Sequence, residues 1–123
     1  MLVEALMCVA LNVYHEARGE PYEGQLAVAE VTYRRVEQPY WPNTACAVVY
    51  QPWQFSWVYE NPKEPDKNSL AWRTALEAAL DGRESNVTTC ATHYFNAKYA
   101  DPYWAKKLQY EQHVGQHEFY CGH

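Results

Sequence analysis

The stretch Tyr14-His15-Glu16-Ala17-Arg18-Gly19-Glu20-Pro21 marks where the first helix of this chain must stop. Apolar residues recur at helical spacing from Leu2 to Tyr14, so a helix with one buried face is expected to run from there into this stretch. Gly19 and Pro21 then end that helix, because glycine suits the residue after a helix end and proline cannot continue the hydrogen-bond ladder. Glu16 is therefore expected in the last helical turn.

A carboxylate is electrostatically unfavourable at that position, because the unpaired carbonyl groups of the last turn carry partial negative charge. The helix dipole and partial burial both raise the pKa of such a carboxyl group. A carboxylic acid that stays protonated near neutral pH can serve as a general acid, for example in glycosidic cleavage. The alternative is a surface ion pair of Glu16 with His15 or Arg18, and the motif alone leaves both interpretations open.

The rest of the chain predicts further helices followed by strands. Helices are expected from residue 21 to about 37, over 45–50 after a cap at Asn43 or Thr44, and over 70–80 between a cap at Asn68 or Ser69 and Gly82. Residues 54–57 are expected as a short strand or extended loop, and residues 89–96 and 114–121 as strands joined by an aromatic loop over 98–112. This order predicts an α+β fold in a single domain, residues 1–123.

Composition limits the classes of partner. The formal net charge of −5 argues against nucleic acid. No apolar run approaches the roughly 20 residues that a transmembrane helix needs. Residues 1–15 lack the basic start and the cleavage site of a signal peptide. Eleven Tyr and five Trp residues could line a carbohydrate groove or simply pack.

Four cysteines allow two disulfides in three connectivities, which would place the protein in an oxidising compartment such as a bacterial periplasm. Cys8, on the first helix, could instead be a buried thiol. The four are Cys8, Cys46, Cys90 and Cys121.

The sequence gives weaker support to two kinds of zinc site. His15-Glu16 resembles the start of a zinc-protease helix, but Gly19 stands where the second His is required. A zinc set could be assembled from Cys90, His93, His113, His117, Cys121 and His123. Gly115 and the strand pattern disfavour a helical His pair, so neither a metal nor another cofactor is expected.

A hydrolase would add a second carboxylate to Glu16. Candidates are Glu20, Glu30, Asp101 and Glu118, and spacing singles out none of them. Ser56 lacks the glycines of a nucleophile elbow. Gln54 and Ser56 alternate onto one face and would suit contacts to the acetamido group of a sugar.

Three separated segments carry a family resemblance. The first runs from Ala10 to Glu20 and continues with Gly24-Gln25-Leu26-Ala27-Val28-Ala29 and Arg35-Val36. The second contains Tyr40, Pro42-Asn43-Thr44, Cys46 and Val48-Val49-Tyr50-Gln51, and leads to Gln54-Phe55-Ser56-Trp57. The third comprises Ala91-Thr92-His93-Tyr94-Phe95, Pro102-Tyr103-Trp104, and Gly115, His117 and Phe119-Tyr120. In this order they resemble the SleB/CwlJ family of cell-wall hydrolases, the spore-cortex-lytic-enzyme type.

The resemblance implies a lysozyme-like, lytic-transglycosylase-like domain that cleaves peptidoglycan glycan strands. We favour a lytic transglycosylase, and the sequence leaves an N-acetylmuramidase open. The resemblance also implies Glu16 as the catalytic acid, with Glu20 more suited to an architectural role. The glycan is expected to contact Tyr14, Arg18, Gln54, Ser56, Trp57, His93, Tyr94 and His117. Peptidoglycan is the expected partner, and a monomer without membrane insertion is expected.

With neither a signal peptide nor a separate wall-binding domain expected, the chain resembles a phage endolysin. Such an enzyme is released to the periplasm by a holin. A piece of a longer bacterial protein would look the same. Two alternatives from other classes remain open: a zinc-dependent peptidoglycan peptidase and a non-catalytic cell-wall-binding module.

Overall fold

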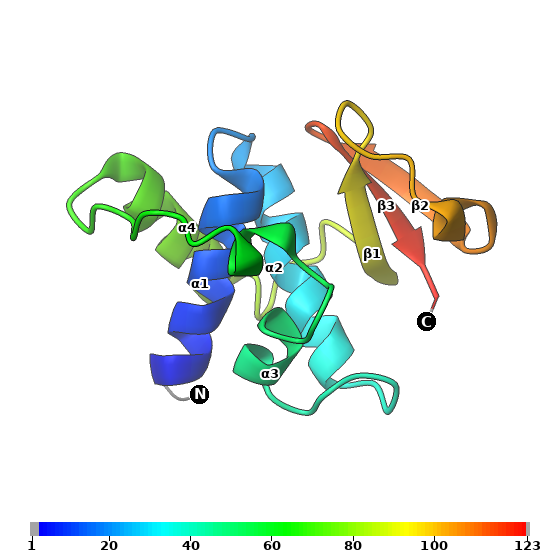
Figure 1. Ribbon diagram of the computed structural model, residues 1–123, viewed down its shortest axis with the longest axis horizontal. Coiled ribbons are helices and arrows are strands. Elements are labelled where there is room, and N and C mark those ends of the chain that lie inside the picture. Colours follow the sequence, from blue (N-terminus) through cyan, green and yellow to red (C-terminus); the bar gives the residue numbers. More distant parts are fainter. Residues whose placement is uncertain (1–2, 123) are drawn as a thin grey trace.

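Helix α1 (Val3–Ala17) is the central element of the helical part, and it packs against all three other α-helices. The structure, a computed structural model, describes residues 3–122. Figure 1 shows α1 beside α2 (Tyr22–Val36), α3 (Ala45–Val49) and α4 (Leu70–Asp81), with a sheet to one side. The buried core takes its residues mainly from α1, α2 and α4, and Phe119 joins it from the sheet.

The helix ends follow the predicted signals. Gly19, with φ of 85°, adopts the left-handed conformation just beyond α1, where a side chain would be strained. Thr44 Oγ1 accepts a hydrogen bond from the Ala47 amide (3.1 Å), and Ser69 Oγ accepts one from Trp72 (3.2 Å). Of the alternatives left open, Thr44 and Ser69 are therefore the capping residues.

The sheet has three antiparallel strands in the order β1-β3-β2, formed by β1 (Ala91–Asn96), β2 (Gln109–Val114) and β3 (His117–Cys121). The predicted α+β fold with a small antiparallel sheet is confirmed, and β1 and β3 correspond to the two strands expected over 89–96 and 114–121. The third strand, β2, begins inside the predicted aromatic loop, where its polar sequence gives no apolar alternation. The turn before β3 contains Gly115 with φ of 61°.

Residues 54–57 do not form a strand. Their backbone pairs within turns: Gln54 N–H donates to the Gln51 carbonyl, and Val58 N–H donates to that of Phe55. The 3-10 helix η1 (Ser56–Tyr59) follows, and a second one, η2 (Tyr103–Lys106), precedes β2. Phe55 is extended and immediately precedes η1, but no strand lies alongside this segment in the described chain, so it joins no sheet.

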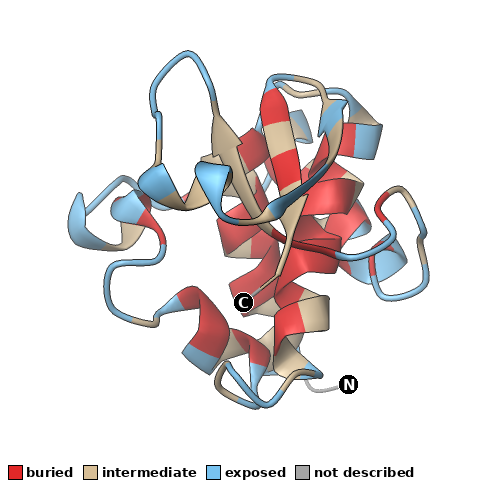
Figure 2. Cartoon of the chain, turned by 90° about the vertical axis from the view of Figure 1, so that its right-hand side faces the viewer, coloured by how far each residue is buried: buried red, intermediate tan, exposed pale blue. Residues whose placement is uncertain are grey.

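Charged side chains of α2 hold the segment that enters β1. The buried Glu30 carboxylate accepts from the amides of Val87 (2.9 Å) and Thr88 (2.7 Å), from Thr88 Oγ1 (2.6 Å), and from the Ser85 hydroxyl. Arg34 Nη1 donates to the Ala91 carbonyl (2.7 Å). Figure 2 shows the buried residues concentrated where the helices meet the sheet. These contacts fix β1 against α2.

Two disulfides join distant segments. Cys8–Cys46 ties α1 to α3, and Cys90–Cys121 ties the start of β1 to the end of β3. The alternative of a buried Cys8 thiol is therefore wrong. Because four cysteines allow three connectivities, only the folded chain selects between them.

Removing the Cys8–Cys46 disulfide, which spans 38 residues, is expected to lower the free energy of unfolding by about 3 kcal/mol, because the unfolded chain gains conformational freedom. Urea unfolding of the Cys8→Ser, Cys46→Ser double variant measures this. An unchanged midpoint and slope would contradict the expectation.

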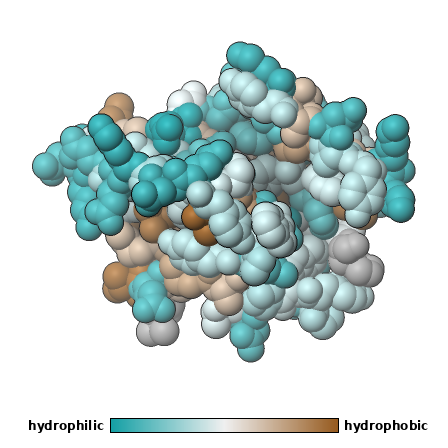
Figure 3. Space-filling model, viewed as in Figure 1, coloured by the Kyte–Doolittle hydropathy of each residue, from teal (hydrophilic) through white to brown (hydrophobic). Residues whose placement is uncertain are grey.

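No helix in residues 3–122 is long and apolar enough to cross a membrane. The face in Figure 3 is mostly hydrophilic, with hydrophobic residues scattered over it.

Candidate active site

A cleft of about 800 Å³ opens where the end of α1 meets the sheet and the segment around η1. Elements far apart in sequence build its wall, so only the folded chain forms it. The lining residues are His15, Glu16, Trp53, Gln54, Phe55, Ser56, Tyr59, Glu60, Tyr94, Phe95, Asn96, Tyr99, Ala100 and His117.

Glu16 lies in this cleft in the last turn of α1, as predicted. Burial raises the pKa of its carboxyl group to about 7. A hydrogen bond from Tyr94 opposes that rise, and the negative charge of Glu60 adds to it. Near neutral pH a substantial fraction of Glu16 is therefore protonated and able to donate a proton.

A directional chain of hydrogen bonds supports Glu16. Trp57 Nε1–H donates to Asn12 Oδ1 (2.8 Å), and Asn12 Nδ2 donates to the Tyr94 hydroxyl oxygen (3.3 Å). Because an indole nitrogen can only donate, the amide oxygen of Asn12 must face Trp57 and its NH₂ must face Tyr94. The Tyr94 hydroxyl proton is then free for Glu16. One Glu16 oxygen is held as an acceptor, which leaves the other to carry the proton.

Two histidines border the cleft in their neutral form. Burial lowers the pKa of His117, against the opposing influence of Glu20, and the His117 ring meets the edge of Tyr94 at 5.3 Å between centroids. Burial and then Arg18 lower the pKa of His15, which stacks on Trp57 at 4.5 Å. Neither ring is a cation at neutral pH.

Glu20 lies outside the cleft and fixes the turn before β3. Its Oε1 accepts from the Gln116 amide (2.6 Å) and lies 3.5 Å from His117 Nδ1, at the outer limit of a hydrogen bond. A Cβ atom at Gly115 would collide with the same oxygen. These contacts support the predicted architectural role of Glu20.

None of the four candidate second carboxylates lines the cleft. Glu30 is buried against the segment before β1, and Glu118 accepts from Tyr110 (2.9 Å) and pairs with His113 (2.6 Å). Asp101 is exposed on the loop before η2. The carboxylate that does share the cleft with Glu16 is Glu60, which spacing gave no reason to select.

Trp53 is a second lining residue that the sequence did not reveal. Its side chain is 87% exposed, and its backbone has φ of 67°, unusual for a residue with a side chain. Its ring stacks on Tyr59 at 5.4 Å, and its amide donates to the Tyr59 hydroxyl (3.2 Å). Strained, exposed residues of this kind concentrate at functional sites.

A smaller hollow of about 260 Å³ adjoins the cleft, and Glu16 borders both. Five of its lining residues also line the main cleft, and three line only this hollow. These are Arg35, His93 and Trp104.

Five of the eight predicted contact residues line the main cleft or the smaller hollow, and three line neither. Gln54, Ser56, Tyr94 and His117 line the main cleft, and His93 lines the smaller hollow. The other three line neither of them. Trp57 is buried and hydrogen-bonded to Asn12, and the Arg18 guanidinium lies over the Tyr14 ring at 4.6 Å.

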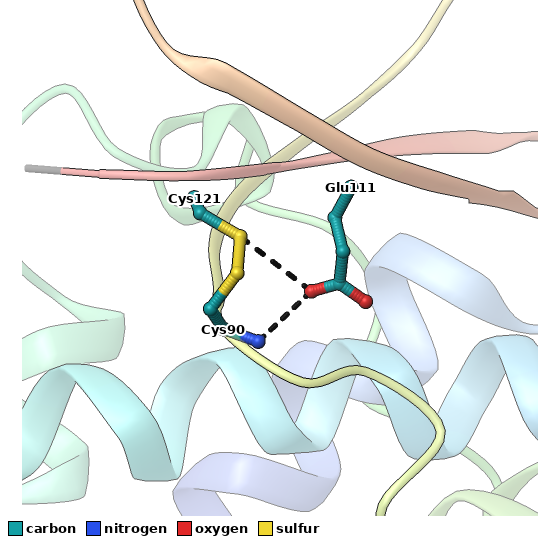
Figure 4. Close-up of side chains that lie close together, drawn as sticks. All are labelled: Cys90, Glu111 and Cys121. Atoms are coloured by element: carbon teal, nitrogen blue, oxygen red, sulfur yellow. Dashed lines mark hydrogen bonds between the residues drawn. A yellow bond between two sulfur atoms is a disulfide. The ribbon is translucent and has the colours of Figure 1, made fainter.

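The two cysteines of the possible zinc set, Cys90 and Cys121, are bonded to each other in a disulfide. Figure 4 shows the Cys90–Cys121 bridge beside Glu111, whose Oε1 accepts from the Cys90 amide (2.9 Å) and lies 3.6 Å from Cys121 Sγ. A bridged sulfur is not a thiolate, so this trio lacks the ligand type that zinc requires. His123 lies outside the described residues.

Comparison with known proteins places this geometry in context. A family model described as cell wall hydrolase matches residues 19–120. A spore cortex-lytic enzyme of Bacillus subtilis (strain 168) is 35% identical over 111 residues, covering 90% of this chain and 35% of that protein. One from Oceanobacillus iheyensis is 34% identical over 114 residues, covering 93% and 40%. The chain thus spans well under half the length of these relatives.

Solved structures show the same fold. The catalytic domain of a germination-specific lytic transglycosylase, SleB from Bacillus anthracis, superposes with a TM-score of 0.84 at 33% identity, over 99% of this chain and 97% of that one. The catalytic domain of the Bacillus cereus SleB protein gives 0.79 at 30% identity, over 99% and 93%. The resemblance predicted from the motifs is confirmed.

Proposed function

The chain belongs to the cell wall hydrolase family, and from that membership we propose that it cleaves the glycan strands of peptidoglycan as a lytic transglycosylase. The observation that carries the proposal is Glu16, a carboxyl group with a pKa of about 7 in an aromatic-lined cleft. The similarity to the catalytic domain of a lytic transglycosylase supports it. We propose that residues 1–123 suffice as one catalytic domain.

In the proposed reaction Glu16 donates its proton to the glycosidic oxygen as the bond from C1 of muramic acid breaks. The Tyr94 hydroxyl then stabilises the Glu16 carboxylate by its hydrogen bond. That carboxylate takes the proton of the C6 hydroxyl of the same sugar, whose oxygen attacks C1. The product is a 1,6-anhydro sugar, and Glu16 regains its proton.

Glu60 makes hydrolysis a second candidate, because it is a carboxylate in the same cleft. A muramidase would need it to activate water or to stabilise the cationic centre. Glu60 is exposed and contributes to the raised pKa of Glu16. We assign to Glu60 the electrostatic role of raising the pKa of Glu16. The Glu60→Gln variant should therefore keep most of the activity, with its alkaline limb moved to lower pH.

Digestion of purified peptidoglycan separates the proposal from its alternatives. Soluble glycan fragments that still carry their stem peptides would support a glycosidase. Free stem peptides over an intact glycan would support a peptidase. Binding to the sacculus without any release would indicate a wall-binding module.

The rate is expected to fall as pH rises through about 7, because the proton donor is lost as Glu16 ionises. Tyr94→Phe removes the hydrogen bond that lowers the pKa of Glu16, so the alkaline limb of kcat should move to higher pH. A pH series of glycan release for both proteins measures this. A limb that moves to lower pH would contradict the assigned role of Tyr94.

Trp53→Ala is expected to raise KM about tenfold with little change in kcat, because an exposed indole at the rim of the cleft can stack on a sugar face. Initial rates over a range of soluble glycan concentrations separate the two constants. Tyr103→Ala, which removes another highly exposed ring outside the cleft, is the matched control. An unchanged KM for Trp53→Ala would contradict this stacking.

The proposed place of action is the bacterial cell wall, on the oxidising side of the cytoplasmic membrane, where both disulfides persist. The proposed partner is peptidoglycan, bound by a monomer. Release by a phage holin stays a prediction.

A further inference from the structure

Arg35 is a buried cation beside the proposed proton donor. Its side chain belongs to α2, and the residue is only 4% exposed. Nε–H donates to the Thr92 carbonyl (2.8 Å), and Nη1–H donates to Gln54 Oε1 (3.1 Å). Both acceptors are neutral. Within residues 3–122, no carboxylate oxygen lies within the 4.0 Å of its nitrogens that defines an ion pair.

Aromatic rings compensate this charge only in part. The guanidinium carbon lies 5.0 Å from the centroid of Trp41 and 5.7 Å from that of Phe55. Such contacts favour a cation, but the rings carry no net charge. Burial lowers the pKa of Arg35 to about 10, which leaves the group charged at neutral pH but poorly solvated. A buried charge of this kind normally has an anionic partner.

The place for such a partner is the smaller hollow. Arg35 lines it together with Glu16, Gln54, His93 and Trp104. Its volume of about 260 Å³ suits a compact group rather than a sugar chain. Because Glu16 also borders the main cleft, a group in this hollow would be attached close to the glycosidic bond that Glu16 protonates.

We propose that this hollow is a subsite for a carboxylate carried by the substrate, and that Arg35 binds it. The inference rests on the proposed function. Muramic acid supplies this chemistry in two ways: through its own lactyl carboxylate where the stem peptide has been removed, or through a carboxylate of the stem peptide. A planar guanidinium matches a carboxylate better than an ammonium group does. The bound anion would also favour the protonated form of the neighbouring Glu16.

Three small ligands test the subsite on the unmodified protein. N-acetylmuramic acid, its methyl ester and N-acetylglucosamine share one sugar ring but differ in the lactyl group and its charge. Titrations followed by the indole N–H signals of the tryptophans should show the acid binding about tenfold more tightly than the ester, with the Trp104 and Trp41 signals shifting. Equal binding of acid and ester, or a Trp104 signal that does not shift, would overturn the proposal.

A charge variant assigns the effect to Arg35. Arg35→Gln should abolish the difference between acid and ester, and Arg35→Lys should keep part of it. Arg73→Gln removes an exposed positive charge on α4 and should keep the full difference. A folded Arg35→Gln protein with the full preference would overturn the assignment. The ligand comparison on the unmodified chain stands even if Arg35→Gln does not fold.

Polymeric substrates then distinguish the two sources of the carboxylate. The first pair is peptide-stripped glycan and the same glycan with its lactyl carboxylates amidated. Faster cleavage of the unamidated form would identify the lactyl carboxylate as the group that Arg35 binds. Faster cleavage of peptide-bearing glycan than of its amidated form would assign the stem peptide. Equal rates with every pair would overturn the subsite and leave the proposed function intact. Failure to cleave any glycan would instead overturn the proposed function.

Discussion

Glu16→Gln is expected to lower kcat for glycan cleavage by about a thousandfold, because the amide keeps the shape of the side chain but cannot donate a proton. The substitution keeps an oxygen to accept the Tyr94 hydrogen bond, so the cleft should stay assembled. Substrate binding should change little. The measurement is kcat and KM on soluble glycan strands, with Glu60→Gln as the matched change of a second carboxyl group in the same cleft.

The same substitution has a stability signature. The folded-state pKa of Glu16, about 7, lies above the ordinary value of 4.5, so the folded state loses stability as pH rises between these values. Glu16→Gln should therefore be more stable than the unmodified protein at pH 8, by about 1–3 kcal/mol, and equally stable near pH 4. A variant that keeps its full rate, or one that unfolds at pH 8, would contradict this account.

Glu30→Ala is expected to lower the free energy of unfolding by about 3–5 kcal/mol, the largest stability effect we expect from a single substitution. The Glu30 carboxylate is 3% exposed and accepts from two backbone amides and two hydroxyl groups. Removing it leaves these buried donors without an acceptor and opens a cavity. Because they belong to the segment entering β1, activity should also fall through displacement of Tyr94.

Urea unfolding of Glu30→Ala measures this effect, with Glu23→Ala on the same helix as the control. Glu23 is exposed, and its removal should change stability by less than about 1 kcal/mol. A Glu30→Ala midpoint equal to that of the control would show that the four hydrogen bonds contribute little.

The helices could be predicted because each carries a local signal. The apolar period of α1, the left-handed Gly19 and the capping hydroxyl of Ser69 act over a few residues. Strand β2 could not be predicted, because its polar side chains show no alternation and only pairing with β3 makes it a strand. The disulfide pairing likewise depends on distances that exist only after folding.

The residues of the cleft also divide into those that the sequence predicts and those that only the folded chain reveals. Glu16 was predictable from its place at a helix end, and Gln54 and Tyr94 from the family motifs. Asn12 was missed, although a polar residue within a buried apolar stripe is itself a signal for a buried hydrogen-bond network. Trp53 and Glu60 were missed because a turn and η1 carry them to the cleft, and no sequence period records that path.

Digestion of peptidoglycan in water enriched in ¹⁸O, followed by mass spectrometry of the released fragments, shows whether the sugar's own hydroxyl or water attacks C1. Attack by the sugar's own C6 hydroxyl predicts 1,6-anhydro-muramic ends, lighter than reducing ends by one water and free of ¹⁸O. Reducing muramic ends that carry ¹⁸O would contradict this mechanism, because they would show that water captures the cationic centre.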